Sequence, residues 1–75
     1  MTKYKNLGGE SGIIAYEIGA DFIRLQFEDK EIYLYTEDST GAIHIAKMKE
    51  LAEKGHGLNT YVNQHVRSNY DKKET

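Results

Sequence analysis

The chain has 75 residues, with 10 Lys and Arg against 12 Asp and Glu, so its formal net charge is −2. This length predicts one small domain, and the negative charge argues against nonspecific binding of nucleic acid. The sequence has no Cys, which excludes disulfides and thiolate sites and fits a reducing cytoplasm. It shows neither a signal peptide nor an apolar run of the ~20 residues that span a membrane. We therefore expect a cytoplasmic protein without a membrane partner.

Charge is distributed unevenly along the chain. Acidic residues outnumber basic ones in residues 1–40, and the reverse holds in residues 41–73. The C-terminal half therefore carries either the ordinary surface charge of solvated helices or a modest basic face.

Three strands are predicted after a loosely ordered lead-in over residues 1–10. Apolar and polar residues alternate in SGIIAYEIG (11–19), FIRLQFE (22–28) and EIYLYT (31–36), which is typical of half-buried strands. Tight connections separate them at Ala20-Asp21 and Asp29-Lys30. The ordered domain is expected to cover residues 11–70, followed by a tail over 71–75.

The register of these strands follows from the length of the two connections. If both are two-residue hairpin loops, Ile18 pairs with Ile23, and Phe27 pairs with Ile32. Directly paired residues project from the same face. One face then collects the residues expected to be covered by helices: Ile14, Tyr16, Ile18, Ile23, Leu25, Phe27, Ile32 and Leu34.

The same register places Tyr33 and Tyr35 on the opposite, open face, beside Arg24. Agreement among three strands on one apolar face favours this arrangement. However, Asp29-Lys30 lacks the Gly that a two-residue turn prefers. A three-residue loop would instead place both tyrosines inside.

Two helices are predicted after the strands. Ser39 or Thr40 can cap the first, and Gly55 can end it. Gly57 opens the second. Apolar residues fall at helical spacing in the first helix (Ala42, Ile45, Met48, Leu51, Ala52) and in the second (Leu58, Tyr61, Val62, His65, Val66).

The predicted fold class is therefore α+β: a three-stranded antiparallel β-meander with one face covered by two C-terminal helices, in the order β-β-β-α-α. Asn59, Asn63 and Arg67 are spaced four residues apart. They form a polar row on the side of the second helix that faces away from its apolar stripe.

Several short patterns resemble the KTSC domain, a small domain found at the C-terminus of some lysyl-tRNA synthetases and as a free-standing bacterial protein. They are Tyr33-Leu34-Tyr35, the ending Tyr61-Val62-Asn63 with Val66-Arg67 and Tyr70, and the start Ser11 with Ile14-Ala15-Tyr16. The resemblance covers about residues 10–71. The chain departs from it by having no Pro before the first helix and by having Leu34 where relatives often carry a polar residue.

The family that the chain resembles has no established activity. The resemblance implies an RNA-binding role. A non-catalytic binding module for single-stranded RNA or tRNA is thus the first hypothesis. Aromatic rings can stack unpaired bases, and Asn and Arg can contact base edges and phosphates. The candidate binding residues are Tyr33, Tyr35, Arg24, Asn63 and Arg67, with Lys47 and Lys49 as electrostatic support.

Structural roles are open for the same residues. Strands favour Tyr in any case, and Asn63 or Arg67 can tie a helix to the sheet. The second hypothesis is a protein-interaction or self-association module, in which Phe22 and Ile13 join the two tyrosines on an exposed sheet face. Salt distinguishes the two hypotheses, because phosphate contacts weaken steeply as salt rises.

Catalytic, cofactor and metal sites are not expected. His44, His56 and His65 lack the spacing of metal ligands. Gly8-Gly9 and Gly55-His56-Gly57 are not followed by the Lys-Ser/Thr of a phosphate-binding loop. No nucleophile has an evident base nearby in sequence. The sequence therefore predicts a protein that is not an enzyme.

Overall fold

The computed structural model describes residues 1–9 and 12–74. Glu10, Ser11 and Thr75, assigned above to the lead-in, the start of the domain and the tail, lie outside these ranges. Five strands form one antiparallel sheet in chain order: β1 (Thr2–Lys3), β2 (Ile13–Ile18), β3 (Phe22–Phe27), β4 (Ile32–Thr36) and β5 (Lys72–Lys73). The helices are α1 (Glu37–Thr40), α2 (Ala42–Lys54), α3 (Leu58–Tyr61) and the π-helical segment η1 (Val62–Val66).

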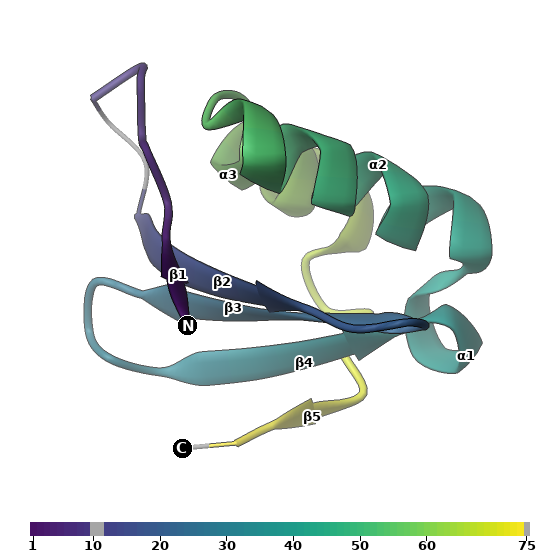
Figure 1. Cartoon of the computed structure of the whole chain (residues 1–75). Coiled ribbons are helices and arrows are strands. Elements are labelled where there is room, and N and C mark those ends of the chain that lie inside the picture. Colours follow the sequence, from purple (N-terminus) through teal and green to yellow (C-terminus); the bar gives the residue numbers. More distant parts are fainter. Residues whose placement is uncertain (10–11, 75) are drawn as a thin grey trace.

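Helices α2 and α3 lie over one face of the sheet (Figure 1). The α+β class with an antiparallel sheet is therefore confirmed. The three-stranded, two-helix layout needs correction, because the sheet has two further strands at its edges. They come from residues expected as lead-in and tail, and Tyr4 is only 2% exposed within the core. Across the described ranges, the helices are too short or too polar to span a bilayer.

The first hairpin has the predicted register next to its turn. Ile18 pairs with Ile23 and Tyr16 pairs with Leu25, as expected. A bulge between Ile13 and Ala15 then shifts the pairing by one residue. Ile13, rather than Ile14, therefore pairs with Phe27 and is fully buried.

The second hairpin has a three-residue loop, so the predicted pairing of Phe27 with Ile32 is wrong. The amide of Phe27 donates to the carbonyl of Glu31 at 2.9 Å, and Lys30 adopts a left-handed φ of 72°. A side-chain oxygen of Asp29 accepts from the amide of Glu31 at 3.0 Å. A turn followed by a left-handed residue is the usual form of such loops, and Asp compensates for the missing Gly by its hydrogen bond.

This one-residue shift reverses the two faces of β4. Tyr33 pairs with Leu25 and Tyr35 pairs with Ile23, so both tyrosines lie on the helix-covered face. Ile32 and Leu34, expected there, lie on the other face. Ile18, also expected in the core, is 36% exposed at the end of β2.

The core is built where the helices meet this face. Helix α2 buries Ile45, Met48, Leu51 and Ala52, as its spacing predicts. It ends at Gly55, which is left-handed with φ 80°. The N-cap of α2 is Gly41, without a side-chain cap, rather than Ser39 or Thr40. Thr36 caps the preceding helix α1 by accepting from the amide of Ser39. The remaining core residues include Tyr4, Ile13, Ile23, Leu25, Tyr35, Leu58, Val62 and Val66.

Candidate functional site

A groove of about 380 Å³ opens between the sheet and η1. It contains four of the seven candidate residues predicted from sequence: Tyr33, Tyr35, Asn63 and Arg67. Strand β4 supplies the two tyrosines, while Asn63 lies in η1 and Arg67 follows it. We call this site the aromatic groove and define it by Phe27, Tyr33, Tyr35, Asn63, Arg67 and Tyr70.

The aromatic side of the groove is a set of edge-to-face rings. The Tyr33 ring lies 5.6 Å from Phe27 at 87° and 4.8 Å from Tyr70 at 69°. Tyr70 also contacts Tyr35 at 6.2 Å. Such pairs hold one another in fixed orientations. Tyr35 is 2% exposed and Tyr70 is 37% exposed, so Tyr70 is the ring most accessible to a ligand.

The polar side of the groove carries donors that no neighbour uses. Asn63 and Arg67 are exposed, and within residues 1–9 and 12–74 neither side chain makes a hydrogen bond or ion pair. A guanidinium beside aromatic rings can bind an anionic group attached to a flat ring system.

The acidic residues at the rim of the aromatic groove already make contacts within the protein. Glu31 forms an ion pair with Lys73 and accepts a hydrogen bond from the Tyr33 hydroxyl at 3.3 Å. Asp29 accepts from the backbone of Glu31. The charge of Glu31 is therefore balanced by Lys73, whereas Asp29 keeps its negative charge, and neither carboxylate pairs with Arg67.

Burial keeps the groove tyrosines protonated. It is the main cause that raises the pKa of Tyr33, and the Glu31 carboxylate adds to it. Burial also raises the pKa of Tyr35 to about 12. Both hydroxyls, like that of an ordinary tyrosine, are neutral at physiological pH and can donate hydrogen bonds, and the raised pKa extends this state further into alkaline pH.

The pKa of Tyr35 predicts a loss of stability in alkali. The unfolded chain releases the Tyr35 proton near pH 10, whereas the folded chain keeps it until about pH 12. The contribution of Tyr35 to the free energy of unfolding is therefore complete below pH 10 and falls as the pH rises towards 12, by about 2 kcal/mol. Urea unfolding at pH 9, 10.5 and 11.5 measures it. The free energy of unfolding of Tyr35→Phe should fall less than that of wild type over this pH range. If the two proteins show the same pH profile, the Tyr35 hydroxyl is not buried.

Arg24 lies on the opposite face of the sheet from the groove. It pairs with Glu74 at 2.7 Å and with Glu17 at 3.1 Å, and its guanidinium lies 4.7 Å from the Phe22 ring centroid. The hydrogen bond to Glu74 is the main cause that raises the pKa of Arg24. Its predicted place beside the tyrosines was wrong because the register of β4 differs.

The two candidate lysines are on α2 and do not line the groove. Lys47 pairs with Glu50 at 3.5 Å on the helix surface. Lys49 donates to the backbone carbonyls of Gly19 at 2.7 Å and Ala20 at 3.1 Å. Lys49 therefore ties α2 to the β2–β3 turn, and neither lysine supports the groove electrostatically at close range.

The exposed aromatic sheet face that the self-association hypothesis requires is not assembled. Ile13 and Tyr35 are buried in the core, at 0% and 2% exposure. Phe22 lies beneath the Arg24 guanidinium instead of next to Tyr33. The hypothesis therefore loses the surface on which it was based.

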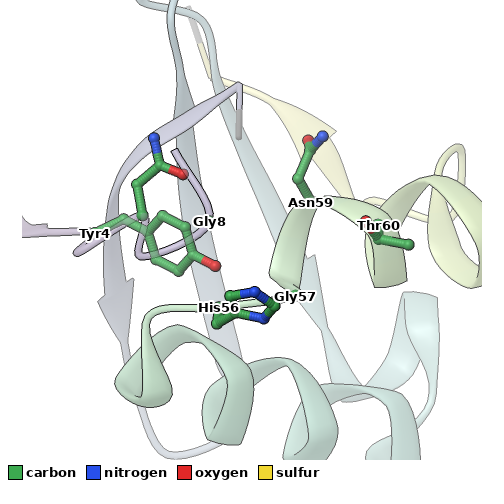
Figure 2. Close-up of a pocket in the computed structure, with 7 residues that line it drawn as sticks. Tyr4, Gly8, His56, Gly57, Asn59 and Thr60 are labelled. Carbon is green, nitrogen blue, oxygen red and sulfur yellow. The ribbon is translucent and has the colours of Figure 1, made fainter. Parts of the chain in front are cut away.

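A second hollow lies where the N-terminal segment meets the connection between α2 and α3. Its volume is about 290 Å³. Figure 2 shows Tyr4 and His56 facing it from one side and Asn59 from α3. The Asn59, Asn63 and Arg67 row was the sequence signal that could have pointed to it. We call it the polar hollow, lined by Tyr4, Asn6, Gly8, His56, Gly57, Asn59 and Thr60.

Two histidines that are distant in sequence meet on the helical side of the molecule. His44 Nδ1 lies 2.6 Å from the Tyr61 hydroxyl, and the Tyr61 ring is 4.5 Å from that of His65. Sequence spacing gave no sign of this contact. Among the residues that the structure describes, no three His, Cys, Asp or Glu side chains gather closely enough to hold a metal ion.

The chain matches no protein-family model, no curated protein and no solved structure. Its function is therefore inferred from the geometry of the aromatic groove and the polar hollow.

Proposed function

We propose that this chain is a small non-catalytic binding module, resembling the KTSC domain, that takes single-stranded RNA into the aromatic groove. The observation that carries the proposal is that one groove holds the accessible Tyr70 ring together with Asn63 and Arg67, whose side chains make no hydrogen bond or ion pair with the described residues. Unpaired bases stack on Tyr, and their edges and phosphates accept or donate hydrogen bonds that Asn and Arg can supply.

The charge around the groove sets what kind of binding is expected. Arg67 can neutralise one phosphate, and Lys73 is already paired with Glu31. Stacking should therefore supply most of the affinity, at about 1–3 kcal/mol per base. The dependence on salt should be shallow, with a slope of about −0.7 for one phosphate on a single strand.

The test is fluorescence anisotropy with a labelled single-stranded RNA pool at several salt concentrations. Tyr70→Ala should weaken binding by about 5- to 100-fold, because it removes one stacking ring, and should leave the salt slope unchanged. Arg67→Ala should weaken binding less and flatten the slope by about 0.7.

Arg24→Ala is the matched control for Arg67→Ala. It removes the same charge from the opposite face of the sheet, so it should leave the slope unchanged. Tyr70→Phe keeps the ring and should bind nearly as wild type does. Wild-type protein that binds no RNA in the pool, or equal slopes for the Arg67 and Arg24 variants, would overturn the proposal.

A further inference from the structure

The aromatic groove and the polar hollow lie on one helical stretch of the chain. Asn59 lines the polar hollow from α3. Asn63 and Arg67 line the aromatic groove from η1 and its end. Since these residues are four apart, they follow one another along the same side of the helical segment. At the α-helical rise of ~1.5 Å per residue, Asn59 to Arg67 would span ~12 Å, and the π-helical η1 makes this row shorter.

Gly12 lies between the two sites. A Cβ atom at Gly12 would be 3.9 Å from the Asn59 side-chain oxygen and 4.0 Å from Cδ2 of Phe27. Asn59 belongs to the polar hollow and Phe27 to the aromatic groove. Among the described residues, Gly12 therefore joins the two sites without a side chain of its own between them, and we call this point the Gly12 saddle. Its carbonyl accepts from the amide of Glu28 at 2.8 Å, which fixes this backbone next to β3.

Each end of this path offers a ring to a flat ligand. Tyr70 is the accessible ring of the aromatic groove. His56 is exposed in the polar hollow, where a Cβ at Gly8 would lie 3.4 Å from its Nε2 atom. The His56 ring therefore lies near Gly8 at the border of the hollow. Histidine can stack a base as Tyr does.

We infer that the two sites form one continuous track that binds about three consecutive nucleotides of a single strand, across the Gly12 saddle. This inference rests on the proposed function. Three nucleotides is an upper limit for a row of this length, because ~3.4 Å per nucleotide is the spacing of a fully stacked helical strand and bases that stack on separate rings lie farther apart. One base stacks at Tyr70 and another at His56, while the side-chain amides of Asn63 and Asn59 contact the strand between them.

An extended peptide fits this track less well than a single strand of RNA. Peptides that bind in extended form usually add to an open strand edge. Strand β1 covers part of β2, and β5 covers part of β4. The donors that line the track are side-chain amides and a guanidinium, which match base edges and phosphates.

The experiment compares ligands of different length on the full chain. Binding of AMP and of the trinucleotide ApApA is followed by NMR titration, with UMP and UpUpU as a second pair. Wild type should bind each trinucleotide about tenfold more tightly than its mononucleotide, because a second base stacks. Gly12→Leu should reduce this gain to less than threefold and leave mononucleotide binding unchanged.

Further variants keep the test decisive if Gly12→Leu disturbs the fold. His56→Ala and Asn59→Ala should each reduce the gain with length, and Tyr70→Ala should weaken binding of both the mononucleotide and the trinucleotide. If wild type binds the mononucleotide and the trinucleotide with equal affinity, the continuous track is overturned. The proposal that the aromatic groove binds a nucleotide would still stand. No binding of either ligand would overturn the proposed function together with the track.

Discussion

Tyr35→Ala should destabilise the domain more than any other single change at the groove. The side chain is 2% exposed and packs in the core against Ile23 of the neighbouring strand. Removing a buried aromatic ring costs about 3–5 kcal/mol, through lost burial and the cavity left behind. For a domain of this size, that corresponds to a decrease in melting temperature of about 15–30 °C, or to complete loss of folding.

Thermal melts followed by circular dichroism measure this decrease. Tyr35→Phe keeps the ring and should change the melting temperature by only a few degrees. Ile43→Ala is the exposed control, because Ile43 is a large apolar residue that is 85% exposed, and truncations of that kind are usually within about 0.5 kcal/mol. A Tyr35→Ala protein that melts within 5 °C of wild type, with ~5 °C being about 1 kcal/mol here, would show that the ring is not in the core.

Gly55→Ala should also lower the free energy of unfolding, by less than Tyr35→Ala does. Gly55 has φ 80°, and a Cβ atom there would lie 2.6 Å from Cβ of Lys5. The left-handed conformation costs a residue with a side chain about 1–2 kcal/mol, and the overlap adds about 1–3 kcal/mol. The overlap cannot be relieved by a side-chain rotation, because Cβ of Lys5 is fixed to the backbone. The Leu7 amide also donates to the Gly55 carbonyl at 2.7 Å.

Two other glycines separate the two causes. Gly9 has φ 77° but open space around its Cβ position, so Gly9→Ala should show the conformational cost alone. Gly12 has neither a left-handed φ nor an overlap, so Gly12→Ala should be close to neutral. Urea unfolding of the three variants should therefore rank Gly55 above Gly9 and Gly9 above Gly12. If Gly55→Ala and Gly9→Ala lower the free energy of unfolding equally, the overlap with Lys5 does not contribute to the effect.

The sequence predicted the helices better than the sheet. Apart from Ala42, which is exposed, the predicted stripe of α2 is buried and the helix ends at Gly55 as predicted. Helical spacing and a C-terminal Gly are strong local signals. Strands β1 and β5 have two residues each, which is too short for any alternation to be seen. Tyr4 shows the consequence, because a core residue lies in a segment that looked like a loose lead-in.

The register of β4 depended on one loop. Lys30 adopts a left-handed conformation that Gly would normally provide. The residue types in the loop therefore did not indicate that it has three residues rather than two. The missing Gly did identify the loop as the uncertain point, and the alternative with Tyr33 and Tyr35 inside is the one that the structure has. Asn63 and Arg67 still join them in the groove because η1 packs over that same face.

The π-helical segment η1 has a consequence for how the length of this chain can vary. A π-helix corresponds to an α-helix with one extra residue in the turn. Deleting one residue within it, such as Gln64, would let the helix continue with α-helical hydrogen bonds. Because the extra residue only widens one turn, the later residues would keep approximately the same side of the helix.

Such a deletion would therefore leave Val66 in the core and Arg67 in the aromatic groove, although both now stand at the end of the five-residue segment η1. In related chains, a single-residue gap within η1 is thus expected to preserve the groove. A gap of one residue within α2 has the opposite effect, because it would turn every later residue of that helix by about 100° and disrupt its buried stripe.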